Sequence, residues 1–67
     1  MTMNDMKSIQ GQLTQVAETI RNACVQAAQQ GYERAAVDGL CDEGALEVAL
    51  DAIRSLDIES LLRELKR

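Results

Sequence analysis

The 67-residue sequence has no histidine, no proline and a single aromatic residue, Tyr32. Without histidine, the chain lacks the most common general base, the most common metal ligand and any serine–histidine or cysteine–histidine pair for nucleophilic catalysis. Without proline, the chain lacks the residue that breaks a helix most strongly. We therefore predict no catalytic residue, no metal ligand and no cofactor site, and we expect that the protein is not an enzyme.

Cysteine is also scarce. Cys24 and Cys41 are too few for the disulfide scaffold of a small secreted protein, and neither has a further Cys or a His at metal-ligand spacing. If the chain folds back as a helical hairpin near residue 38, their Cα atoms lie much further apart than the roughly 7 Å that a disulfide tolerates. We expect two small buried side chains, and a reactive or intermolecular thiol at Cys41 is the alternative.

Positive charge and long apolar runs are the remaining shortages. The formal net charge is −4 and the sequence pI is about 4.5, so attraction to phosphate backbones or anionic lipid is not expected. No apolar run exceeds three residues, which argues against a transmembrane span or a secretory signal. We therefore expect neither nucleic acid nor membrane as a partner and, by default, a cytoplasmic protein.

What the sequence does contain is apolar residues at helical spacing. At 100° per residue, ten of them fall on one stripe, whereas the opposite face carries mostly neutral amide side chains. The stripe consists of Met6, Ile9, Leu13, Val16, Ala17, Ile20, Ala23, Cys24, Ala27 and Ala28. This pattern predicts a long amphipathic helix.

The end of this helix depends on Gly31, which either caps it or lies inside it at a cost of about 1 kcal/mol relative to alanine. We favour the second alternative, because residues 32–37 contain good helix formers and no turn residue. Gly31 then lies close to the face of Ala35, and such small residues let another helix approach closely. Asp38-Gly39 is a turn signal, so we expect the helix to end there and Asp38 to cap the next helix.

A second helix is expected over about residues 40–55. Its apolar residues are centred on one side, near Leu46 and Ile53, with Val48 and Leu50 at the margins. Together they occupy an arc of roughly 200°, which is wider than a single hairpin partner covers. The surplus predicts a second contact surface on this helix.

A short third helix is expected from Ile58 to Leu65, where apolar residues keep i, i+3, i+4, i+7 spacing behind the cap candidate Asp57. The predicted fold is therefore all-α: a helical hairpin followed by a short C-terminal helix, in one domain over residues 1–67. A chain of this length builds only a thin core, and dimerisation is one way to complete it.

Acidic residues gather at the start of the second helix and along it, and no basic residue stands among them between residues 38 and 51. They lack the alternating oxygen ligands of a calcium loop and the histidine partners typical of a carboxylate-bridged metal pair. We expect a solvated acidic face. Its sharper alternative is a docking stripe for a basic protein partner, formed by Glu43, Glu47 and Asp51.

Residues 39–57, GLCDEGALEVALDAIRSLD, resemble a stretch of short all-helical bacterial proteins without an assigned function. The resemblance covers less than a third of the chain and carries over no catalytic residue. Its recurring positions suit a corner and helix start as well as a site: Gly39, Leu40, Cys41, Glu43, Gly44, Glu47, Arg54, Leu56 and Asp57. Helix propensity does not explain Gly44, for which close approach of another backbone is one reason.

The sequence thus predicts a small non-enzymatic interaction module or accessory subunit that binds a protein partner or a second copy of itself. The alternative is a small metal- or thiol-dependent accessory protein that uses Cys41 and the acidic face. A helix-turn-helix DNA reader is disfavoured, because the turn at residues 54–57 has no glycine and the third helix offers few basic or amide side chains.

Overall fold

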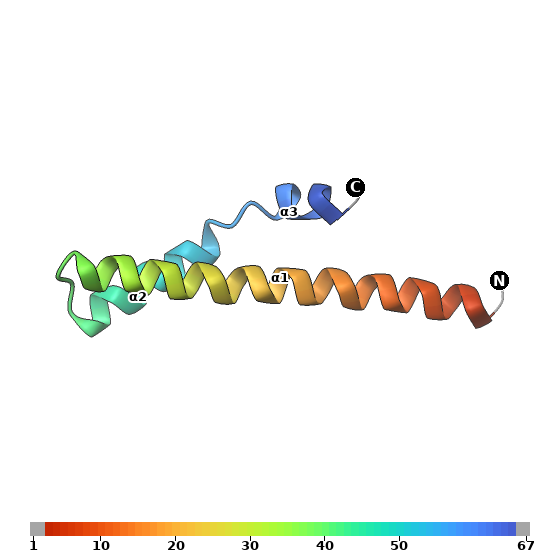
Figure 1. Cartoon of the computed structure of the whole chain (residues 1–67), viewed down its shortest axis with the longest axis horizontal. Helices are drawn as coiled ribbons and strands as arrows, with labels where there is room; N and C mark the ends of the chain where they lie inside the picture. The colour runs from red at the N-terminus through yellow and green to blue at the C-terminus, as the bar shows by residue number, and fades with distance from the viewer. Residues whose placement is uncertain (1–2, 66–67) are drawn as a thin grey trace.

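The computed structural model describes residues 3–65, with side chains from residue 9 onward, and this part consists of three α-helices without a strand. Helix α1 spans Met3–Val37, α2 spans Asp42–Arg54 and α3 spans Ile58–Leu65. Helix α2 turns back beside the C-terminal part of α1, and α3 lies over the middle of α1 (Figure 1). The predicted all-α hairpin with a short third helix is confirmed. The side chain of Met6, predicted as part of the α1 stripe, lies outside the described residues.

Backbone hydrogen bonds around Gly39 build the turn that ends α1. Leu40 N donates to Ala35 O and Gly39 N donates to Ala36 O, both at 3.0 Å, which are the two bonds of a Schellman motif. Gly39 has a φ of +90°, a backbone conformation that residues with a Cβ adopt only at a cost. The predicted end of the first helix at Asp38-Gly39 is confirmed.

Helix α2 begins with a different cap from the one predicted. Its N-cap is Cys41, whose side chain makes no capping hydrogen bond, and Asp42 and Glu43 place negative charge in the first turn, where it favours the helix dipole. The prediction that Asp38 caps α2 is wrong. Asp38 still belongs to the end of α1, where its N–H donates to Arg34 O at 3.0 Å, and three residues separate it from α2.

Gly44, in the first turn of α2, makes room for the side chain of Leu40. A Cβ at Gly44 would stand 3.3 Å from Leu40 Cδ2 and 3.5 Å from Leu40 Cβ. The close neighbour is therefore a side chain and not the second backbone that the sequence suggested. Leu40 itself stays exposed while it covers this helix start.

Helices α1 and α2 meet through small residues. Gly31, inside α1 as predicted, is buried, and a Cβ there would stand 3.2 Å from Ala52 Cβ and 3.3 Å from Val48 O. Both distances are shorter than ordinary van der Waals contact, so the close helix approach that the small residues predicted is confirmed. The buried hydrophobic residues of the described part are Ala35, Ala45 and Ala49.

Helix α3 begins at the predicted cap. Asp57 Oδ1 accepts a hydrogen bond from Ser60 N at 3.1 Å, and Asp57 Oδ2 accepts one from Ser60 Oγ at 2.7 Å. Because the hydroxyl of Ser60, and then its backbone N–H, donate to the carboxylate, they hold the pKa of Asp57 below its ordinary value. The prediction that Asp57 caps this helix is confirmed.

Acidification is expected to loosen the start of α3. Because the pKa of Asp57 is lowered in the folded chain, the carboxylate stabilises the cap at pH values above the ordinary 3.8, and this contribution is lost as the pH falls through the folded-state pKa. We expect the NMR signals of Ser60 and its successors to move toward random-coil values between about pH 5 and pH 2. In a Ser60→Ala control, the pKa of Asp57 should return toward its ordinary value. NMR signals of α3 that do not change with pH, in either the unmodified protein or the Ser60→Ala variant, would contradict this prediction.

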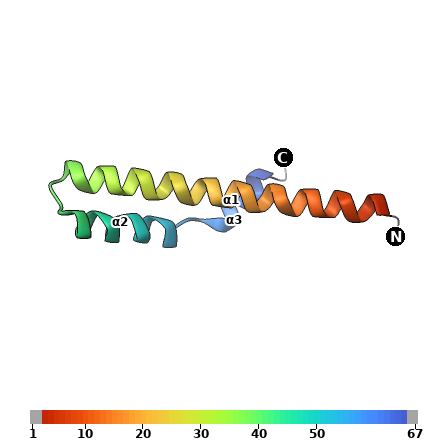
Figure 2. The same ribbon diagram turned by 90° about the horizontal axis from the view of Figure 1, so that it is seen from below.

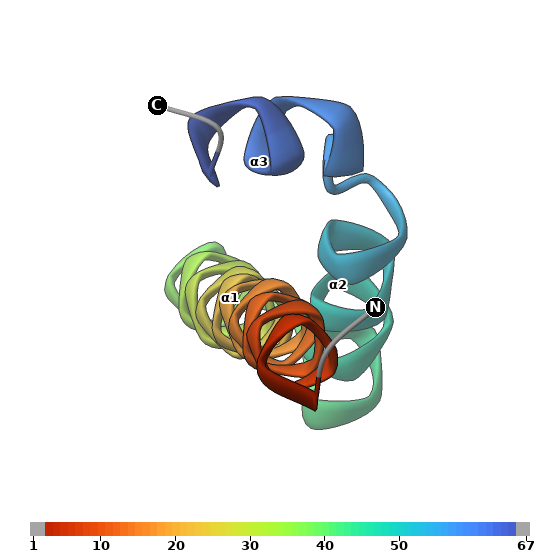
Figure 3. The ribbon, with the colours of Figure 1, turned by 90° about the vertical axis from the view of Figure 1, so that its right-hand side faces the viewer.

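The molecule is long and thin, with extents of 56 × 19 × 14 Å. Its radius of gyration is 16.4 Å, compared with about 11 Å for a compact domain of this length. At 1.5 Å per residue, α1 is about 52 Å long and α2 about 20 Å, so α2 is able to cover only part of α1. The N-terminal part of α1 extends beyond both other helices (Figure 2), which lie on two sides of α1 when the molecule is viewed end-on (Figure 3).

Candidate interaction surface

The described part of the chain buries small hydrophobic residues and exposes large ones. Its buried hydrophobic residues are alanines, and it holds no large side chain that is fully buried. The exposed large hydrophobic residues are Ile9, Leu13, Val25, Tyr32, Val37, Leu40, Leu46, Leu50, Ile58 and Leu62. Single exposed apolar residues are common on proteins, but a fold that covers so few of its large ones leaves apolar surface for another polypeptide.

Helix α1 leaves much of the apolar arc of α2 uncovered. Leu46 is 54% exposed and Leu50 is 37% exposed, while Val48 and Ile53 are half-buried. The buried positions of α2 belong to alanines. The prediction that one neighbouring helix does not cover this arc is confirmed at Leu46 and Leu50.

The exposed apolar stripe at the N-terminal part of α1 is the feature that sequence reasoning missed. The sequence predicted a single apolar stripe without indicating which part of it is covered, and the structure leaves Ile9 48% exposed and Leu13 64% exposed. The available signal was length, because a helix over residues 40–55 is too short to cover a stripe that runs from residue 6 to residue 28.

The predicted docking stripe, Glu43, Glu47 and Asp51, lies exposed along α2. Asp51 Oδ1 accepts a hydrogen bond from Arg54 Nη1 at 2.8 Å, and this exposed ion pair contributes at most about 1 kcal/mol. Among the described residues, no side chain forms an ion pair with Glu43 or Glu47. Docking of a basic partner on this stripe stays a prediction.

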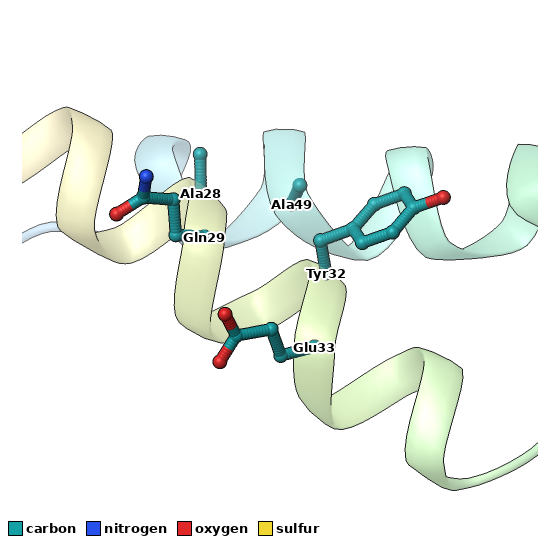
Figure 4. A pocket seen from close by; sticks show the side chains of 5 residues that line it. All are labelled: Ala28, Gln29, Tyr32, Glu33 and Ala49. Carbon is teal, nitrogen blue, oxygen red and sulfur yellow. The ribbon is translucent and has the colours of Figure 1, made fainter.

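Tyr32 links α1 to the first residue of α2 through a side-chain hydrogen bond. Its hydroxyl donates a hydrogen bond to Asp42 Oδ1 at 3.1 Å. The pKa of Tyr32 is raised, first because ionisation would break this bond and then because it would place two negative charges side by side. Beside the ring, a depression of about 310 Å³ is lined by Ala28, Gln29, Tyr32, Glu33 and Ala49 (Figure 4). These side chains come from both helices and include no nucleophile paired with a base.

Both cysteines are free thiols, so the prediction that they form no disulfide with each other is confirmed. Cys24, on α1, is half-buried as part of the apolar stripe. The prediction that Cys41 is buried is wrong, because Cys41 stands outside α2 as its exposed N-cap. Within residues 3–65, no three Cys, Asp or Glu side chains lie together in an arrangement that would hold a metal ion.

No helix of the described part is both long enough and apolar enough to cross a membrane. No protein-family model matches the chain, and comparisons with curated proteins and with solved structures give no significant match.

Proposed function

We propose that the protein is a non-enzymatic helical interaction module that serves as a subunit of a cytoplasmic protein assembly. The observation that supports this function is the inverted distribution of hydrophobic residues in the described part: the buried ones are alanines, and many larger apolar side chains stay exposed. The lack of histidine supports the non-enzymatic part of the proposal.

The energetics of burial favour a function that requires a partner. Each leucine or isoleucine side chain that leaves water stabilises a fold by about 1.5–3 kcal/mol. In the described part of this chain, burial contributes little of that stabilisation, because the side chains that are fully covered are small. A single domain of this length is marginally stable even with an ordinary core. Covering Leu46, Leu50 and the exposed stripe of α1 against another protein adds the missing stabilisation.

Binding of an apolar fluorescent dye by the dilute protein tests the proposal. At low micromolar concentration we expect the chain to bind the dye and to unfold over a broad temperature range, because its large side chains are accessible. Leu46→Gln should reduce the dye signal, whereas the matched control Glu47→Gln, on the polar side of the same helix, should not. A sharp, cooperative unfolding transition without dye binding, in a chain shown by sedimentation to be monomeric, would overturn the proposed function.

A further inference from the structure

The depression beside Tyr32 continues onto the exposed apolar side of α2. Its lining side chains come from α1 and α2: Ala28, Gln29, Tyr32, Glu33 and Ala49 (Figure 4). On α2, Leu46 lies about 60° around the helix from Ala49, and Leu50 follows Leu46 by one turn. The hydrogen bond from Tyr32 to Asp42 places the ring on this same side, because Asp42 lies one turn before Leu46. We call the depression together with the two leucines the hairpin patch.

Helix α3 leaves the hairpin patch uncovered. It lies over the middle of α1, past the end of α2, whereas the patch lies near the turn that joins α1 and α2 (Figures 1 and 2). Among the described residues, α3 packs against α1 and not against α2. Tyr32, Leu46 and Leu50 are all exposed. The patch is therefore an open face of the hairpin, with a hollow beside the two leucines.

Acidic side chains stand around the patch. Glu33 lines the depression itself. Glu43 stands three residues before Leu46, and Glu47 stands three residues before Leu50, so each is a surface neighbour of one leucine on α2. Within residues 9–65, none of these three glutamates takes part in an ion pair. The apolar surface is thus bordered by negative charge on both helices.

The basic residues of the hairpin lie outside the patch. Arg34 lies about 160° around α1 from Tyr32. Arg21 stands seven residues before Ala28, which is about 10 Å along the axis of α1. Arg54, at the end of α2, is already held in an ion pair. Nothing in the patch itself therefore offsets the negative charge of its border.

An apolar face with an acidic border fits one kind of occupant, an amphipathic helix that carries basic residues beside its apolar stripe. A patch formed by two adjacent helices suits a third helix, and the described part of the chain offers no sheet edge to an extended strand. Lysine and arginine on that helix find carboxylates along both edges of the patch. A second copy of this chain brings the same acidic border and a net charge of −4, so like charges oppose it.

We infer that the hairpin patch binds a basic amphipathic helix of another protein. The apolar stripe of that helix packs on Tyr32 and the two leucines, and its basic residues lie opposite the three glutamates. This inference rests on the proposed function and names the class of its partner. It includes Glu43 and Glu47 of the docking stripe that the sequence predicted. It leaves out Asp51, which lies about 140° around α2 from Leu46 and is paired with Arg54.

Fluorescence anisotropy with labelled model peptides tests the inference. The probe is a peptide of about 18 residues, long enough to form a helix, with leucine at helical spacing on one side and lysine on the other. One control carries glutamate in place of every lysine, and a second keeps the composition in an order that breaks the leucine stripe. At about 0.15 M salt, we expect the lysine peptide to bind at least about tenfold more tightly than either control.

Matched variants of the full chain locate the binding site. Leu46→Gln should weaken binding of the lysine peptide at least about tenfold, because it removes apolar surface from the patch. Leu62→Gln changes an exposed leucine of α3, outside the patch, and its affinity should stay within about threefold of the unmodified value. Circular dichroism reports whether both variants keep their helices.

A second pair of variants changes charge and leaves the apolar surface intact. Replacing Glu43 and Glu47 together with glutamine should weaken binding about fivefold and make it less sensitive to salt. The control replaces Glu18 and Glu64, which are exposed on α1 and α3 outside the patch. It removes the same net charge, so an affinity close to the unmodified value shows that local charge, and not total charge, attracts the peptide.

Four results overturn the inference. The lysine and glutamate peptides could bind equally well, or Leu46→Gln and Leu62→Gln could bind the lysine peptide equally well. Sedimentation could show self-association of the unmodified protein that the lysine peptide does not displace, which would make a second copy the occupant. The protein could also bind none of the peptides. If it then still binds the apolar dye and unfolds broadly, this inference fails and the proposed interaction module stands.

Discussion

Replacing Gly31 with leucine is expected to separate α2 from α1 and to unfold the hairpin. A Cβ at this position already stands 3.2 Å from Ala52 Cβ and 3.3 Å from Val48 O, and 3.4 Å from Ala49 Cα. Two of these three neighbours are backbone atoms of α2, which are unable to rotate away as a side chain would. Overpacking of this kind typically costs about 1–3 kcal/mol, and a leucine adds three further carbon atoms beyond the Cβ. That cost is a large share of the stability of a small domain.

Gly11→Leu is the matched control for Gly31→Leu. Gly11 also lies inside α1, but a Cβ there would meet nothing within 4 Å. Both changes raise the helix propensity of α1 by up to about 1 kcal/mol, so only the packing against α2 distinguishes them. Urea unfolding followed by circular dichroism should give a lower midpoint for Gly31→Leu and an equal or higher one for Gly11→Leu. Equal midpoints for the two variants would show that the close contact at Gly31 does not hold the hairpin together.

Ala49→Asp is expected to have a comparably large effect. Ala49 is only 6% exposed and packs against Gly31 of α1, so an ionised carboxylate at this position would lose most of its water. Burying a charge without a partner costs several kcal/mol, which exceeds what this thin core is able to offset. We expect the purified variant to lose the hairpin at neutral pH, as measured by thermal unfolding.

The control for Ala49→Asp is Leu46→Asp, one turn earlier in α2 and on its exposed side. Leu46→Asp removes a larger apolar side chain than Ala49→Asp does, yet the new carboxylate stays in water because position 46 is 54% exposed. We expect the Leu46→Asp variant to keep its fold. The loss of stability caused by Ala49→Asp should become smaller as the pH falls, since protonation of the new carboxylate removes the buried charge. If Leu46→Asp were the less stable of the two variants, the assignment of Ala49 to the buried side of α2 and of Leu46 to the exposed side would be wrong.

Local signals were enough to predict the three helices, the end of α1 and the start of α3 from the sequence, but not the cap of α2. Spacing of apolar residues predicted the long first helix, the turn signal Asp38-Gly39 predicted its end, and Asp57 predicted the start of α3. These features depend on interactions between residues a few positions apart, so neighbouring residues determine them directly. Gly31 was also interpreted correctly, because a small residue among helix formers is typical of a close helix contact.

The sequence by itself determined that three amphipathic helices form and which residues share a side of each. Only the tertiary structure decided which of those sides are covered. Periodicity shows that Ile9 and Leu13 lie on one stripe with Gly31, but coverage depends on where α2 lies along α1, and α2 reaches only the small residues at one end. The same limit applies to Cys41 and Leu40, whose exposure follows from the path of the turn. Burial is a property of the packed pair of helices, and a one-dimensional pattern carries no record of how far the second helix extends.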